Sequence, residues 1–251
     1  MQPDFKGQVV CVTGSARRVG RAIMLAFAER GAHVVIHHGN SDADAASAAE
    51  EARAAGVEAL VLKADLADPA AIEQLFKDIQ AHYDRLDVLV NSAANFKRNQ
   101  LLDISLEEWH SVIDTNLRAP FLATQHAARL MITGGRGGVI LNISDNSGLH
   151  GWAERGHHSI AKAGILMLTR VSAKALAEHQ IRVNCVVPGP VLVPAGASPA
   201  VLDSLADMLP LKRIGTPEHI AQAMVFLASN DFATGSVLSI DGGEGLVGTE
   251  T

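Results

Sequence analysis

Short runs of apolar, β-branched residues alternate along this chain with longer segments in which apolar residues recur at helical spacing. Most positions in the short runs are apolar, as expected for strands of a parallel sheet that helices cover on both faces. The predicted strands are 8–13, 33–38, 59–64, 86–91, 138–143, 181–187 and 237–241. The predicted helices are 18–30, 43–55, 69–82, 106–131, 159–178 and 217–228. This alternation predicts an α/β, Rossmann-type, doubly wound fold with a seven-stranded, mostly parallel sheet flanked by helices.

The predicted helix ends carry local signals that agree with the pattern. Asp68 precedes Pro69 in the arrangement of an N-cap before a first-turn proline, and Gly31 and Gly56 stand where left-handed glycines end helices. No repeat, low-complexity tract or linker interrupts the chain. We therefore expect residues 1–251 to form a single domain.

One segment, 188–211, departs from the alternation because prolines punctuate it. These prolines are Pro188, Pro190, Pro194, Pro199 and Pro210. A long irregular stretch inside a domain is often a functional loop, so this segment predicts a mobile loop over the site that shapes substrate choice.

Composition narrows the possible partners. The formal net charge is -6, with 21 Lys+Arg against 27 Asp+Glu, which argues against nucleic-acid binding and favours a small-molecule partner. No run of 18 apolar residues occurs, so we expect a cytoplasmic protein that does not enter a membrane. Cys11 and Cys185 lie in apolar stretches that predict buried, inert thiols. Adjacent His37 and His38 diverge and have no third ligand spaced nearby, so we predict no metal site.

The first predicted strand ends in a turn that contains two glycines, Gly14 and Gly20, and leads into a helix. A helix N-terminus offers unpaired N–H groups and a positive dipole end, which together bind a pyrophosphate. Two glycines alone are weak support, because a strand-to-helix turn without a ligand has the same form.

Further motifs follow this turn in order and carry a resemblance. They include Asp65 in ADL, NSAA from Asn91 to Ala94, Asn116 in DTNLRAPF, Lys162 in SIAKAG, and then VVPGPV and SIDGG. Together with TGSARRVG, they resemble a classical short-chain dehydrogenase/reductase over essentially the whole chain. The resemblance implies an NAD(P)H-dependent oxidoreductase. Its implied cofactor-binding residues are Gly14, Arg17, Arg18, Gly20, His37, Asn40, Ser41, Asp65, Leu66, Asn91, Ala93, Lys162, Pro188 and Gly189.

The end of the second predicted strand bears on which cofactor binds. NAD-preferring relatives carry an acidic residue there that binds the ribose 2′-OH, whereas this chain has His37. A 2′-phosphate would meet Arg17, His37, Asn40 and Ser41, a cationic and donor-rich rim. We therefore predict NADPH as the cofactor, with mixed preference as the alternative if the histidines are merely exposed loop residues.

Three residues resemble those of pteridine reductases within this family. Arg18 gives the turn the form TGxxxRxG, Phe96 corresponds to the phenylalanine that stacks on the pterin, and Asp145 replaces the family's serine. A carboxylate suits a heterocycle whose N–H and NH₂ groups donate hydrogen bonds. The implied substrate-binding residues are Arg18, Phe96, Asp145 and Trp152, although Trp152 equally fits a role in capping the core.

The tyrosine that the family places four residues before Lys162 is missing, and His158 stands in its position. Histidine performs acid–base chemistry, so the resemblance implies Asp145, His158, Lys162 and Asn116 as the catalytic set. Lys162 would disfavour an imidazolium at position 158 and Asp145 would favour it, so sequence leaves the balance open. His157 is the alternative if the helix begins one residue differently.

Three functional hypotheses remain. The first is NADPH-dependent hydride transfer to a C=N of a dihydropterin-like substrate, which relies less on a positioned acid because an imine nitrogen is basic. The second is a carbonyl reductase of the 3-oxoacyl or sugar type, and the third is a catalytically impaired NADPH-binding protein. The resemblance also implies a homo-oligomer, a dimer or a homotetramer, packed through the helices at 106–131 and 159–178.

Overall fold

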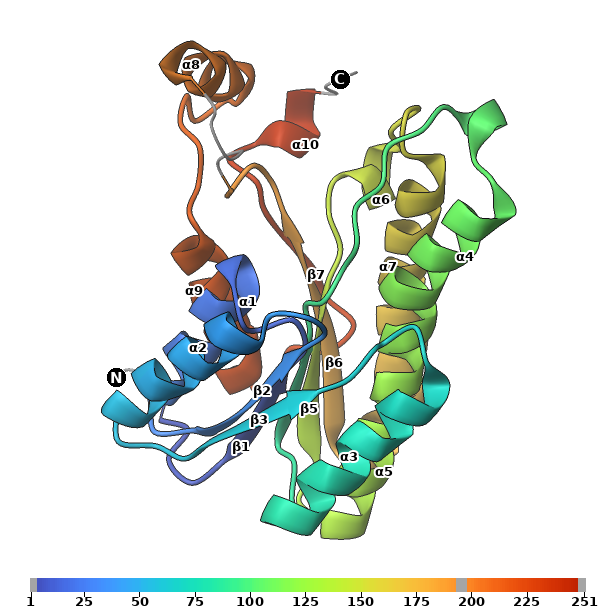
Figure 1. Ribbon diagram of the computed structural model, residues 1–251. Helices are drawn as coiled ribbons and strands as arrows, with labels where there is room; N and C mark the ends of the chain where they lie inside the picture. Colours follow the sequence, from blue (N-terminus) through green and yellow to red (C-terminus); the bar gives the residue numbers. More distant parts are fainter. Residues whose placement is uncertain (1–3, 193–197, 248–251) are drawn as a thin grey trace.

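A seven-stranded sheet lies at the centre of the structure, a computed structural model that describes residues 4–192 and 198–247 (Figure 1). Its strand order is β3-β2-β1-β4-β5-β6-β7, and every neighbouring pair is parallel. The strands are β1 Val9–Val12, β2 His33–His38, β3 Ala59–Lys63, β4 Val88–Asn91, β5 Gly138–Ile143, β6 Ile181–Pro188 and β7 Val237–Ile240. The predicted doubly wound α/β fold is confirmed.

Helices cover the sheet in two layers, each with its own apolar core. In Figure 1, α1, α2 and α9 lie on one side of the sheet, and α3, α4, α5 and α7 lie on the other. The helices of the first layer are α1 Arg18–Ala28, α2 Asp42–Ala54 and α9 Pro217–Ser229. Those of the second are α3 Pro69–Tyr83, α4 Leu106–Ile113, α5 Ala119–Gly134 and α7 Gly156–Leu176. Because helices bury both faces of the sheet, the sequences of the strands are almost continuously apolar.

Short helices complete the chain. They are α6 Ser147–His150, α8 Pro199–Met208 and α10 Glu244–Val247, with the 3₁₀ segments Leu101–Asp103 and Ala177–His179. Among the described residues, no helix is both long and apolar enough to cross a membrane.

The strand order reverses beside β1, which pairs with β2 on one edge and with β4 on the other. The chain therefore leaves the carboxyl ends of β1 and β4 in opposite directions. In open parallel sheets, a reversal of this kind leaves a crevice outside the carboxyl ends of the strands, where ligands bind. The fold thus brings the turns after β1, β4 and β5 to one edge of the sheet.

Two predicted elements differ from the structure. The helix expected at 106–131 is interrupted by a π-helical turn, Asp114–Arg118, which separates α4 from α5. The segment 188–211 is not irregular throughout, because α8 lies within it. Pro199 occupies the first turn of α8, where its missing N–H costs no hydrogen bond, so this proline begins a helix. Pro194 and the adjoining residues 193–197 lie outside the described residues, and the mobility of the segment stays a prediction.

Candidate active site

A cleft of about 820 Å³ opens at the carboxyl edge of the sheet. Its volume is within the range of small-molecule sites. Most of the predicted site residues line it: Gly14, Arg17, Arg18, Gly20, His37, Asn40, Asp65, Leu66, Ala93, Phe96, Asp145, Trp152, His158, Lys162, Pro188 and Gly189. Ser41, Asn91 and Asn116 are described in the structure but are absent from this lining. The fold therefore gathers residues from most of the chain's length at one site.

The turn between β1 and α1 is built so that only glycine fits at two positions. Gly14 has a φ of +67°, and a Cβ there would stand 2.9 Å from Ala93 Cα. A Cβ on Gly20 would stand 2.3 Å from the carbonyl oxygen of Gly14. Arg18 also adopts a left-handed φ, +55°, a conformation that favours glycine. The bare backbone edge and the start of α1 fit a pyrophosphate.

His37 corrects part of the predicted cofactor rim. Its Nδ1 accepts a hydrogen bond from the Gly14 N–H at 3.0 Å, and its Nε2 lies 3.1 Å from the carbonyl oxygen of Ala64, to which it donates. Burial lowers the pKa of His37 to about 4. The ring is neutral and braces the glycine turn, so it adds no positive charge to the rim predicted to meet a 2′-phosphate.

Of the other residues predicted to meet a 2′-phosphate, two line the cleft and one does not. Arg17 and Asn40 line the cleft beyond β2, and the Arg17 guanidinium forms an exposed ion pair with Asp44 at 2.5 Å. Ser41 precedes α2 outside the cleft lining. Asn91 is buried, and its Nδ2 donates to Asn142 Oδ1 at 2.9 Å, so its side chain joins neighbouring strands instead of facing the cleft.

Three of the four predicted catalytic residues, Asp145, His158 and Asn116, form a chain of hydrogen bonds. His158 Nε2 lies 2.6 Å from Asp145 Oδ2, and its Nδ1 lies 3.3 Å from Asn116 Nδ2. The backbone of Asn95 fixes the orientation of the Asn116 amide, because its N–H donates to Asn116 Oδ1 at 2.8 Å and its carbonyl accepts from Nδ2 at 2.9 Å. Since an amide donor faces Nδ1, the ring hydrogen stays on Nε2 and points at Asp145. His158 thus directs its hydrogen at a carboxylate, away from the open cleft.

His157, the alternative to His158, lies elsewhere. Its side chain is fully buried, and neither of its ring nitrogens has a hydrogen-bond partner among the described residues. It therefore forms no hydrogen bond with Asp145. The register of α7 therefore selects His158.

Asp145 and Lys162 carry opposite charges at the floor of the cleft. Burial opposes ionisation of Asp145, but the hydrogen bond from His158 and the charge of Lys162 outweigh it, so the pKa of Asp145 is lowered. Burial lowers the pKa of Lys162, against the attraction of Asp145. Lys162 Nζ donates to the carbonyl of Ile143 at 3.0 Å. Asp145 is therefore an anion in a largely buried setting.

Aromatic rings form the wall beside this pair. The ring of Phe96 meets the His158 ring edge-on, with centroids 4.6 Å apart, and is 57% exposed. The Arg155 guanidinium lies 3.9 Å from the Phe96 ring centroid, a cation–π contact, and 5.7 Å from that of Trp152. Phe96 and Trp152 both line the cleft. A flat substrate has an aromatic wall here, with one face of Phe96 covered.

Sequence reasoning missed two charged residues near the cleft. Arg155 has no hydrogen-bond or ion-pair partner for its side chain within 4–192 and 198–247. Glu244 lines the cleft directly and follows the SIDGG motif by one residue. Its place at the end of a recognised motif was the available signal.

The chain matches known proteins over nearly its whole length. The family model described as Enoyl-(Acyl carrier protein) reductase matches residues 14–244. A 3-oxoacyl-(acyl-carrier-protein) reductase of Synechocystis sp. is 36% identical over 239 residues, covering 94% of this chain and 96% of the relative. One from Staphylococcus epidermidis is 34% identical over 236 residues, covering 92% and 96%. The structure of acetoin dehydrogenase from Enterobacter cloacae is similar with a TM-score of 0.90 and 30% identity, covering 96% of each chain.

The glycine turn, the buried lysine and the dinucleotide-sized cleft fit a nicotinamide cofactor, as this family uses. The chain belongs to the short-chain dehydrogenase/reductase family of NAD(P)H-dependent oxidoreductases.

Proposed function

We propose that this protein is an NADPH-dependent reductase of dihydropterin-like substrates that hydrogenates a ring C=N bond. The observation that carries the proposal is Asp145, a largely buried carboxylate held ionised in the cleft by His158. Carboxylate oxygens only accept hydrogen bonds, so Asp145 suits the N–H and NH₂ donors of an amino-substituted heterocycle. The wall formed by Phe96 and Trp152 suits the flat ring of such a substrate.

Different residues of the cleft would bind the cofactor and orient the substrate. Gly14, Gly20 and the start of α1 would hold the pyrophosphate of the cofactor, and Lys162 would bind the nicotinamide ribose, as the family resemblance implies. NADPH, when bound, supplies a hydride. Asp145 orients the substrate, and its buried partner His158 holds the carboxylate in place through the hydrogen bond at 2.6 Å.

NADPH is favoured over NADH by the residues beyond β2. No carboxylate follows His37 directly, while Arg17 and Asn40 line the cleft there. The Arg17 cation contacts Asp44, and it is 58% exposed, so it is free to exchange that partner for a 2′-phosphate.

Carbonyl reduction of a 3-oxoacyl substrate is the second candidate. Its support is the naming of the relatives with 34% to 36% identity as 3-oxoacyl-(acyl-carrier-protein) reductases. The unpaired Arg155 beside Phe96 also suits a substrate with an anionic group. A ketone oxygen is less basic than an imine nitrogen, so this reaction depends more on a proton donor.

A substrate comparison separates these candidates. NADPH oxidation is followed with dihydropterins, cyclic imines, 3-oxoacyl thioesters and simple ketones, with Asp145→Asn beside the wild type. We expect turnover of dihydropterins, and a kcat/KM lower by about 10-fold or more in Asp145→Asn, since one charge-assisted hydrogen bond contributes about 1.5–3 kcal/mol. Turnover of 3-oxoacyl thioesters alone would replace the first candidate by the second. Binding of NADPH without turnover of any substrate would assign the protein a binding role.

A further inference from the structure

Apart from Lys162, to which the family resemblance gives the role of binding the nicotinamide ribose, the groups described above present no acidic hydrogen to the cleft. His158 directs its ring hydrogen at Asp145, and Asp145 is held ionised. The Ser144 hydroxyl donates to the carbonyl of Lys162 at 2.9 Å, and His37 donates to Ala64. Reduction of a C=N or C=O bond adds a hydride to carbon and a proton to the heteroatom, so a donor is still required.

Glu244 is one of three carboxyl residues that line the cleft, with Asp65 and Asp145. Asp65 follows β3 and accepts a hydrogen bond from the Ala67 N–H at 2.9 Å, whereas Glu244 lies beside the Asp145 segment. It begins α10, which follows β7, and its Oε2 accepts a hydrogen bond from Asn146 Nδ2. Asn146 is the residue that follows Asp145 at the end of β5. A contact between residues 98 positions apart in sequence thus places the Glu244 carboxyl next to the Asp145 segment.

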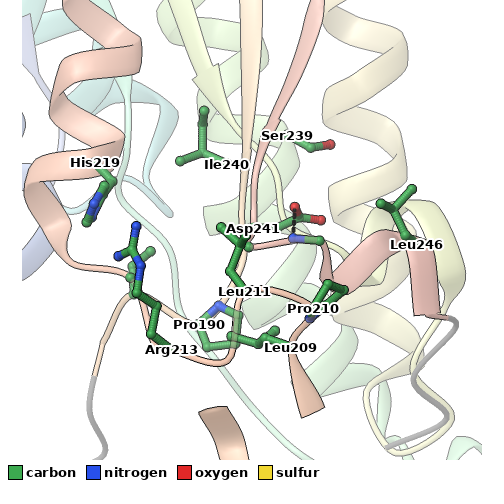
Figure 2. A pocket seen from close by; sticks show the side chains of 14 residues that line it. Pro190, Leu209, Pro210, Leu211, Arg213, His219, Ser239, Ile240, Asp241 and Leu246 are labelled. Carbon is green, nitrogen blue, oxygen red and sulfur yellow. Dashed lines mark hydrogen bonds between the residues drawn. The ribbon is translucent and has the colours of Figure 1, made fainter. Parts of the chain in front are cut away.

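The turn that carries Glu244 is held in place by its own residues. Asp241 accepts hydrogen bonds from the Gly243 N–H at 3.0 Å and the Gly245 N–H at 2.9 Å. Gly243 has a φ of +89°, and a Cβ there would stand 2.7 Å from Pro210 Cγ. Figure 2 shows Asp241 and Pro210 on the wall of a second cavity, of about 410 Å³. The turn therefore lies between two cavities and presents Glu244 to the larger one.

The surroundings of Glu244 raise the pKa of its carboxyl group. Burial raises its pKa, and the carboxylates of Asp241 and Asp145 raise it further, against the hydrogen bond from Asn146 and the neighbouring His150.

We propose that Glu244 donates the proton that the substrate heteroatom receives during reduction, the role left open by the missing tyrosine at position 158. The inference rests on the proposed reductase function and applies to a C=N or a C=O substrate. The substrate carbon gains the hydride of the reduced nicotinamide, and the heteroatom gains the proton as the O–H bond of Glu244 breaks. The resulting carboxylate regains a proton from water through the open cleft.

The test compares the wild type with Glu244→Gln, which keeps the shape but carries no acidic proton, and with Glu244→Asp. Leu246→Ala is the matched control, because Leu246 lies on α10 with 87% of its side chain exposed and lines only the second cavity. We measure kcat and KM against pH with the best substrate. General acid catalysis contributes about 100-fold or more, so we expect kcat to fall by that factor in Glu244→Gln with little change in KM. The alkaline decline of the wild-type kcat should disappear with it, and Glu244→Asp should recover part of the rate.

A second measurement does not depend on turnover. In protein labelled with ¹³C at glutamate carboxyl carbons, one resonance should titrate above the ordinary value of 4.5 and be missing in Glu244→Gln. The inference is overturned if no such resonance exists, if Glu244→Gln keeps its kcat and alkaline limb, or if only KM rises. Retained activity in Glu244→Gln overturns this inference alone, whereas no turnover by the wild type overturns the proposed function and this role with it.

Discussion

The bond between His158 and Asp145 leads to a stability prediction that can be worked out from the structure. The two side chains meet at 2.6 Å, with exposed fractions of 1% for His158 and 20% for Asp145. Replacing His158 with Phe keeps a ring in the space but leaves the carboxylate without this donor. Breaking a fully buried pair costs about 3–5 kcal/mol, and a hydrogen bond to a charged group contributes about 1.5–3 kcal/mol. Because one fifth of Asp145 reaches solvent, we expect His158→Phe to lower the free energy of unfolding by about 2–3 kcal/mol at neutral pH.

The pH dependence of that loss identifies its origin. The pKa of Asp145 is lowered in the folded protein, so its contribution is present above the ordinary carboxyl value of 3.8 and is lost as the pH falls through the lower folded value. In His158→Phe, Asp145 loses the hydrogen bond from His158 but keeps the influence of Lys162 and Ser147, so its pKa should rise relative to that in the wild type. The difference between wild type and variant should therefore be large above about pH 5 and shrink at more acidic pH.

A double-mutant cycle provides the assay. Urea unfolding of the wild type, His158→Phe, Asp145→Asn and the double variant is measured across pH at one protein concentration, since self-association would shift apparent stability. The hydrogen bond between Asn116 and His158 is lost both in His158→Phe and in the double variant, so its contribution to the free energy of unfolding cancels in the cycle. We expect a coupling free energy of about 2 kcal/mol at neutral pH. A coupling near zero, or one that does not change with pH, would refute an ionised Asp145 held by His158.

Other predictions address the cofactor and the assembly. Gly20→Ala places a Cβ 2.3 Å from the Gly14 carbonyl oxygen and so distorts the glycine turn. The dissociation constant for NADPH, measured by fluorescence titration, should rise about 10-fold or more. Gly134→Ala is the control, because its Cβ would lie 3.5 Å from the nearest atom, and it should leave the dissociation constant unchanged. Arg17→Ala should weaken NADPH binding about 10-fold and leave NADH unaffected, and an equal effect on both would contradict the NADPH assignment. Met167, 55% exposed on α7, should lie in an interface if the protein is a homo-oligomer, so Met167→Glu should reduce the mass measured by light scattering. An unchanged mass would remove α7 from the interface.

The fold follows closely from the sequence because its signals are local and repeated. Each strand lies within two residues of the predicted limits, since both faces of the sheet are buried and the apolar runs are continuous. Asp68 caps α3 as expected, accepting from the Ala70 N–H. The prolines led to the wrong prediction of an irregular segment at 188–211. Proline breaks a helix in its interior but is favoured in a first turn, and Pro199 occupies the first turn of α8.

The chemistry of the site could be predicted less well from the sequence, because it depends on contacts between residues far apart in the chain. Sequence placed His37 at the cleft, where it lies, but its ring is buried between Gly14 and Ala64, 23 and 27 residues away, and this burial lowers its pKa and keeps it neutral. The Asn91 amide points into the sheet because its hydrogen-bond partner, Asn142, lies far away in sequence on the adjacent strand β5. A motif fixes which residues meet at the strand ends, whereas burial and pairing decide which of them carry charge.

The two departures from the family pattern, at positions 145 and 158, make physical sense together. A histidine facing a serine would leave its ring hydrogen with a weaker acceptor than the Asp145 carboxylate provides. Paired, Asp145 and His158 form a buried, hydrogen-bonded unit that Asn116 completes. That unit holds a negative charge in the cleft instead of delivering a proton. We therefore interpret the pair as part of a substrate-binding surface, and we propose that another carboxyl group, Glu244, supplies the acid.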